Sequence, residues 1–132
     1  MTTVLFACVH NAGRSQMAAA VFNQVADASR ARAISAGTEP GERVHPVVVE
    51  AMRELNVDLS AATPTMLTPE LARQAQMLVT MGCGDECPVV PGARRDDWSI
   101  LDPKGQSSTT VGSIVDNIEA RVRQFIAAER LG

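Results

Sequence analysis

The chain has 132 residues, of which 45% are hydrophobic and 20% are charged, as in an ordinary globular domain with one core. Its net charge of −3 excludes a broadly basic surface, so we expect neither nucleic acid nor an anionic membrane as a partner. No stretch approaches the ~20 apolar residues of a membrane span, and the apolar run at the start is too short for a secretion signal. We therefore predict a single domain over residues 1–132 that acts in the cytoplasm.

The predicted elements alternate between strands and helices along the chain. Short apolar runs favour strands, whereas apolar residues spaced three or four apart favour amphipathic helices. Pro46, and Thr68 followed by Pro69, suit the first positions of helices. The charged run 94–97 is interpreted as a solvated turn. On these signals we predict strands at residues 4–7, 31–36, 77–81 and 98–101, a short extended stretch at 57–59, and helices at 15–28, 46–55, 69–73 and 108–130.

This order of elements predicts an α/β fold. Strands that alternate with helices form parallel units with right-handed crossovers, so we expect a small open four-stranded parallel sheet with helices on both faces. Ligands of such sheets bind beyond the carboxyl ends of the strands. The segments that follow the predicted strands at Cys8, Cys83 and Asp102 should therefore share one edge of the molecule.

The segment from Cys8 to Ser15 joins the first strand to the first helix and is predicted to bind an anion. A turn of this kind points several backbone N–H groups into one concavity at the positive end of the helix dipole. The backbone amides expected to contact the oxyanion are those of Val9, His10, Asn11, Ala12, Gly13 and Arg14.

Four side chains give this loop a chemistry. The amides would stabilise the thiolate of Cys8, and the planar fork of Arg14 can hold two oxygens of a tetrahedral oxyanion. The hydroxyl of Ser15 can donate to the sulfur, and Asn11 tolerates a left-handed backbone and can tie the loop. The pattern indicates a nucleophilic thiolate beneath an oxyanion, although a buried structural cysteine is the commoner fate of this residue type.

Asp102 and two further cysteines could take part in the same chemistry. Asp102 is suited to protonate a leaving group, although Asp-Pro alone also marks the end of a strand. Three cysteines is an odd number, which indicates reactive thiols rather than a disulfide framework. Cys83 and Cys87 lie in a Gly-rich loop from which Cys83 could reach Cys8 by thiol–disulfide exchange. A zinc site and two unrelated buried thiols are the alternatives, and since no second Cys/His cluster has zinc spacing, we predict no metal.

These motifs resemble a known family. Cys8-x5-Arg14-Ser15 with a later Asp102-Pro103 is similar to the low-molecular-weight protein tyrosine phosphatases. The chain resembles the arsenate reductases of that superfamily more specifically, and the resemblance covers essentially the whole chain. The matching segments are Ser35-Ala36-Gly37, Val57-Asp58-Leu59-Ser60, Met81-Gly82-Cys83, Cys87-Pro88, Asp97-Trp98 and Asp102-Pro103-x-Gly105.

The resemblance implies reduction of arsenate to arsenite, as in arsenic detoxification. It implies that Cys8 attacks arsenic while Asp102 protonates the departing oxygen. Cys83 would then attack the adduct, and Cys87 would leave a Cys83–Cys87 disulfide for thioredoxin to reduce. A related branch instead uses mycothiol with mycoredoxin, which would make Cys83 and Cys87 dispensable. Either way, we expect an external thiol reductant and no tightly bound cofactor, in a protein that acts as a monomer.

The chain departs from the best-known members of the family in three places. Its two later cysteines are three residues apart, which is closer than in those members, and Gly13 stands where they carry another cysteine. Ala19 and Thr65 stand where thioredoxin-linked members carry acidic residues for a potassium ion, so the resemblance implies no potassium site here.

Two other functions remain possible at this point. A phosphatase for phosphotyrosine or a small phosphoester would use Cys8, Arg14 and Asp102 in the same way, but a chain with no Tyr and one Trp has few aromatic walls for a tyrosine ring. A non-enzymatic metalloid sensor could use the three thiols to bind arsenite, although the cation of Arg14 would be of no use to a neutral ligand.

Overall fold

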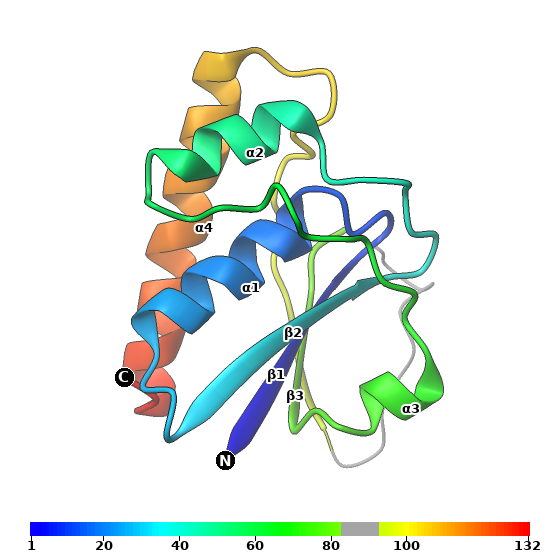
Figure 1. Cartoon of the computed structure of the whole chain (residues 1–132). Coiled ribbons are helices and arrows are strands. Elements are labelled where there is room, and N and C mark those ends of the chain that lie inside the picture. Colours follow the sequence, from blue (N-terminus) through cyan, green and yellow to red (C-terminus); the bar gives the residue numbers. More distant parts are fainter. Residues whose placement is uncertain (83–92) are drawn as a thin grey trace.

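The computed structural model describes residues 1–82 and 93–132, so the predictions for Cys83 and Cys87 lie outside the described residues. Strands and helices alternate along the chain, as predicted (Figure 1). The elements are β1 Thr2–Cys8, α1 Arg14–Val25, β2 Ala31–Gly37, α2 Pro46–Arg53, α3 Pro69–Ala72, β3 Met77–Thr80, β4 Arg94–Asp97 and α4 Ser108–Glu129.

The four strands form one parallel sheet in the order β2-β1-β3-β4. The central strand β1 is buried along almost its whole length, which explains why its sequence is a continuous apolar run. Its last residue, Cys8, pairs with Gly37 at the end of β2, and Ala7 pairs with Thr80 at the end of β3. The three strands therefore end together, and the predicted parallel α/β architecture is confirmed.

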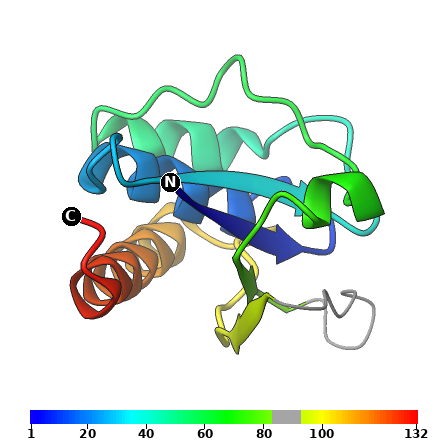
Figure 2. The ribbon, with the colours of Figure 1, turned by 90° about the horizontal axis from the view of Figure 1, so that it is seen from below.

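Helices cover both faces of the sheet, but unequally. The larger core packs Val4, Phe6 and Cys8 of β1 against α1, α2 and α4. The other residues of the same strand, Leu5 and Ala7, point to a smaller cluster beneath α3. Figure 2 shows α3 on the opposite side of the sheet from α1 and α4.

Two of the helices are capped by side chains at their N-termini, whereas α1 and α2 are not, and the uncapped start of α1 lies at the Cys8 loop. Thr68 and Ser107 cap α3 and α4 by accepting hydrogen bonds from the backbone N–H groups of Leu71 and Thr110. The residue before α1 is Gly13, which has no side chain to offer, and the first turn of α1 holds no acidic residue. The positive end of α1 is thus left without a side-chain partner.

The predicted fourth strand is wrong. Residues 98–101 form no strand, and β4 is instead the charged run Arg94–Asp97 that was interpreted as a turn. This run lies at the sheet edge, pairs only with β3 among the named strands and exposes all four residues, so it needs no apolar pattern. Trp98 and Ile100 are buried because they anchor the following segment in the core, not because they belong to a strand. The stretch 57–59 is likewise not a strand.

In residues 1–82 and 93–132, no helix has the length and apolar character needed to cross a membrane.

Candidate active site

The loop between β1 and α1 is held from outside by the chain that follows β2. The backbone carbonyls of the loop accept hydrogen bonds of 2.8–3.2 Å from this segment, in the pairs Thr38 N to Cys8 O, Glu39 N to Val9 O, Gly41 N to His10 O and His45 N to Ala12 O. In a trans peptide the N–H group points away from the carbonyl of the same plane. The N–H group of the residue that follows each of these carbonyls therefore points into the loop. Several inward-pointing N–H groups are the arrangement that an oxyanion requires.

The sulfur of Cys8 lies inside this loop. Cys8 is 2% exposed. The backbone N–H of Asn11 donates to its Sγ at 3.3 Å, and the hydroxyl oxygen of Ser15 lies 2.8 Å from the same atom. Asn11 has a positive φ of 50°, in the left-handed region that this residue type tolerates. Hydrogen-bond donors near the sulfur, together with the uncapped end of α1, favour a negative charge at this position.

Arg14 lies across the loop and links it to the chain after β4. Its Nη1 donates to the backbone carbonyl of Ile100 at 3.4 Å, and its Nη2 lies 3.7 Å from the Oδ2 of Asp102. The guanidinium also packs directly on Gly82, where an added Cβ would collide with the Arg14 Nη1. Gly82 has a positive φ of 102°, so its lack of a side chain serves both the turn and the close approach.

Asp102 reaches the loop because Pro103 packs on Gly13. A Cβ built on Gly13 would lie only 2.7 Å from the Pro103 Cγ. The Oδ1 of Asp102 accepts a hydrogen bond of 3.0 Å from the backbone N–H of Lys104, which fixes one carboxyl oxygen and leaves Oδ2 facing Arg14. The arrangement brings Cys8, Arg14, Ser15 and Asp102 to one edge of the sheet.

His10 belongs to the loop and His45 lies beside it, and the hydrogen bonds of the Cys8 sulfur go to Asn11 and Ser15 rather than to either histidine. The Nδ1 of His10 lies 2.9 Å from the backbone carbonyl of Glu39, which can only accept, so this nitrogen carries a hydrogen. Burial lowers the pKa of His45, an effect that the nearby Asp102 carboxylate partly opposes. A shallow hollow of about 360 Å3 lies between these histidines and Lys104.

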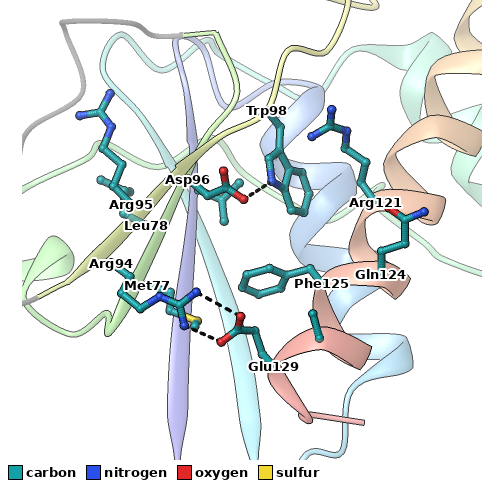
Figure 3. Close-up of a pocket in the computed structure, with 12 residues that line it drawn as sticks. Met77, Leu78, Arg94, Arg95, Asp96, Trp98, Arg121, Gln124, Phe125 and Glu129 are labelled. Atoms are coloured by element: carbon teal, nitrogen blue, oxygen red, sulfur yellow. Dashed lines mark hydrogen bonds and ion pairs between the residues drawn. The ribbon is translucent and has the colours of Figure 1, made fainter.

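A second, larger groove lies away from the loop. It has a volume of about 510 Å3 and lies between β4 and the C-terminal half of α4 (Figure 3). The contacts that join its lining residues include the ion pair between Arg94 and Glu129, the hydrogen bond that the Trp98 Nε1 donates to Asp96, and the guanidinium of Arg121 at 5.8 Å from the Trp98 ring centre. No residue of the Cys8 loop lines this groove. We assign its contacts a structural role, which is to hold the edge strand β4 against α4.

Gln16 belongs to the site, although the sequence did not single it out. Its side chain is 8% exposed and its Nε2 lies 3.1 Å from the Oδ1 of Asn11. A polar residue two positions after Arg14, on the buried face of a helix, is the signal that could have found it. In the part of the chain that the structure describes, no three His, Cys, Asp or Glu side chains lie close enough together to hold a metal ion.

Solved structures show the same architecture. The thioredoxin-dependent arsenate reductase of Corynebacterium glutamicum is 38% identical, with a TM-score of 0.86, over 99% of this chain and 63% of that chain. The present chain thus spans less than two thirds of that protein's length. A low molecular weight protein tyrosine phosphatase of T. tengcongensis has a TM-score of 0.87 at 20% identity, which shows the shared fold alone.

Sequence comparisons agree with the structural ones. Arsenate reductase 2 of Staphylococcus saprophyticus is 32% identical over 127 residues, covering 93% of this chain and 95% of the relative. Arsenate reductase 1 of Bacillus cereus is also 32% identical, covering 93% and 92%. The model of the family "Low molecular weight phosphotyrosine protein phosphatase" matches residues 3–131. The chain therefore belongs to the low molecular weight phosphotyrosine protein phosphatase family, and arsenate reductases are among its relatives.

Proposed function

We propose that this protein is an arsenate reductase that converts arsenate to arsenite, with a role in arsenic detoxification. A phosphatase would use the same loop, so the discriminating observation concerns aromatic side chains. The chain has three Phe, one Trp and no Tyr. All four rings pack against one another in tilted or edge-to-face pairs, with centroid distances of 5.6–6.3 Å, in the pairs Phe6–Phe22, Phe6–Trp98, Phe22–Phe125 and Trp98–Phe125.

Phe6, Phe22 and Trp98 are buried, and the fourth ring, Phe125, belongs to the C-terminal half of α4, so these rings offer no exposed aromatic wall beside Cys8. A phosphotyrosine side chain needs apolar, preferably aromatic, walls to bury its ring, whereas arsenate is a bare tetrahedral oxyanion that needs only amides and a cation. The site therefore fits the inorganic ion better than a phosphotyrosine. The arsenate reductases among the relatives support the same choice.

In the first step, the Cys8 thiolate attacks the arsenic of bound arsenate. A sulfur–arsenic bond forms and one arsenic–oxygen bond breaks, and Asp102 supplies a proton so that the oxygen leaves as water. The loop amides and Arg14 hold the remaining oxygens, while the Ser15 hydroxyl donates to Cys8 sulfur whenever that sulfur is a leaving group.

In the second step, the Cys83 thiolate attacks the Cys8 sulfur. A disulfide forms, the sulfur–arsenic bond breaks, and its electron pair reduces arsenic from the pentavalent to the trivalent state, which leaves as arsenite. Cys87 then attacks Cys83 and frees Cys8 as a thiolate. Thioredoxin returns the Cys83–Cys87 disulfide to two thiols and so supplies the two electrons. We propose that the enzyme acts as a monomer and carries no bound cofactor.

The experiment measures arsenite release from arsenate with two reductants, thioredoxin with its reductase and mycothiol with mycoredoxin. Turnover with thioredoxin that disappears in both Cys8→Ser and Cys83→Ser is the expected result. Turnover only with mycothiol that survives Cys83→Ser would move the second attack to the external thiol. Absence of arsenite in both systems, with hydrolysis of a small phosphoester, would replace the reductase by a phosphatase. Stoichiometric arsenite binding without turnover would instead indicate a sensor.

A further inference from the structure

A chain of buried hydrogen bonds runs behind the Cys8 sulfur and begins at Gln16. We propose that Gln16 is a positioning residue for the nucleophile: its amide acts together with the backbone N–H of Thr65 to hold the orientation of the Asn11 amide, and thereby keeps the Ser15 hydroxyl donating to the Cys8 sulfur. The inference rests on the proposed role of Cys8 as the nucleophile, and it adds a residue of α1 that does not touch the sulfur.

The orientation of both amides follows from the backbone groups at the far end of the chain. The backbone N–H of Thr65 can only donate, and it lies 2.9 Å from the Oδ1 of Asn11, which must therefore be the oxygen. The Gln16 atom that lies 3.1 Å from this oxygen must then be the nitrogen. Its other contact agrees, because the backbone carbonyl of Thr63, at 3.3 Å, can only accept.

This orientation decides what reaches the sulfur. With its oxygen held by two donors, Asn11 turns its Nδ2 toward Ser15 and donates to the hydroxyl oxygen at 2.7 Å. The Ser15 oxygen accepts there, so its own hydrogen is available for the Cys8 Sγ at 2.8 Å. A thiolate can only accept hydrogen bonds, so this direction of donation stabilises the charged form of the sulfur.

Because these side chains are buried, the hydrogen bonds among them are difficult to replace. Asn11 and Ser15 are both 0% exposed, and Gln16 is 8% exposed. Water is therefore a poor substitute for a lost partner, and a reversed Asn11 amide would face two donors with its own donor group. Gln16 also reaches residue 63 in the segment between α2 and α3, so the same side chain ties the catalytic loop to a part of the chain that has no helix or strand of its own.

Two substitutions distinguish the effect of the Gln16 hydrogen-bond donor from the effect of the size and shape of its side chain. Gln16→Met keeps the length and removes both hydrogen bonds. Gln16→Glu keeps the shape but places carboxylate oxygens against the Asn11 Oδ1 and the Thr63 carbonyl, which repel them. Gln24→Met is the matched control, because the Gln24 amide also lies on α1 and donates to a backbone carbonyl, that of Leu55, at 3.0 Å.

The experiment follows alkylation of Cys8 by iodoacetamide as a function of pH in a Cys83→Ser/Cys87→Ser background, in which Cys8 is the one remaining thiol of three. We expect the pH of half-maximal rate to rise by about one unit in Gln16→Met, which corresponds to the loss of one charge-assisted hydrogen bond, and by more in Gln16→Glu. Gln24→Met should leave it unchanged. Ser15→Ala, which removes the last donor directly, should raise it at least as far as Gln16→Met does.

An unchanged half-maximal pH in both Gln16 variants would overturn the proposal, whether or not Ser15→Ala moves it. A thermal unfolding curve for each variant shows whether it is folded over the pH range of the assay, so that partial unfolding is not mistaken for a change in the reactivity of Cys8. The alkylation needs neither arsenate nor a reductant, so failure of this proposal is distinguishable from failure of the proposed arsenate reduction.

Discussion

The contact between Gly13 and Pro103 makes Gly13→Ala a direct test of how Asp102 is placed. The added Cβ would lie 2.7 Å from the Pro103 Cγ, whereas carbon atoms in contact are normally about 3.5–4.0 Å apart. Pro103 must therefore retreat by about 1 Å.

A retreat of Pro103 takes its neighbour Asp102 with it. The Asp102 Oδ2 now lies 3.7 Å from the Arg14 Nη2, and a displacement of about 1 Å in a reacting group costs up to about 100-fold in rate. We expect kcat for arsenate reduction to fall by about 10- to 100-fold. The KM for arsenate should change little, because the oxyanion is bound by the loop amides and Arg14 and not by Asp102.

The assay is steady-state arsenite release, with the free energy of unfolding measured in urea on the same preparations. Gly112→Ala is the matched control, since a Cβ on Gly112 in α4 meets nothing within 4 Å. It should leave turnover unchanged and stabilise the helix by about 1 kcal/mol. A Gly13→Ala enzyme with the kcat of wild type would refute the reasoning, because it would show that Asp102 does not depend on this contact.

Three further predictions concern the stability of the fold. Burial lowers the pKa of His45, so the imidazole binds a proton more readily in the unfolded chain than in the folded one, and wild type should lose stability as the pH falls below about 6.5. Urea unfolding at several pH values should show a smaller loss in His45→Gln, whereas parallel pH profiles for the two proteins would contradict this prediction. Thr68→Ala removes the acceptor of a 3.1 Å bond from the Leu71 N–H and should cost about 1 kcal/mol in the same assay, whereas no loss would mean that the cap is idle. Met52→Ala empties a fully buried position and should cost about 3 kcal/mol, measured by thermal or urea unfolding, and a cost below that of Thr68→Ala would show that the core closes over the cavity.

The sequence alone determined the elements whose causes are local. The run from β1 through the Cys8 loop into α1 is continuous in the chain, so the apolar strand, the loop and the start of the helix could be predicted together. The long helix α4 was equally clear, because its six buried residues recur at helical spacing. The parallel sheet followed from the alternation of these elements.

The tertiary structure alone decided where the edge strand and the distant parts of the site lie. Arg94–Asp97 forms β4 only because β3 offers it a partner, and its exposed side chains leave no apolar signal to find. Asp102 does reach the predicted edge of the sheet, but through the buried Trp98 and Ile100 and not at the end of a strand.

The hydrogen bond from Gln16 to Thr63 joins residues 47 positions apart, and the contact of Pro103 with Gly13 joins residues still more distant in the chain. No local propensity encodes such contacts, because they exist only after the sheet has brought its strand ends together. The Cys8 loop could therefore be predicted from a short stretch of sequence, and Asp102 could be predicted as a candidate acid. The contacts that place Asp102 beside Arg14 and link Gln16 to Asn11 required the folded chain.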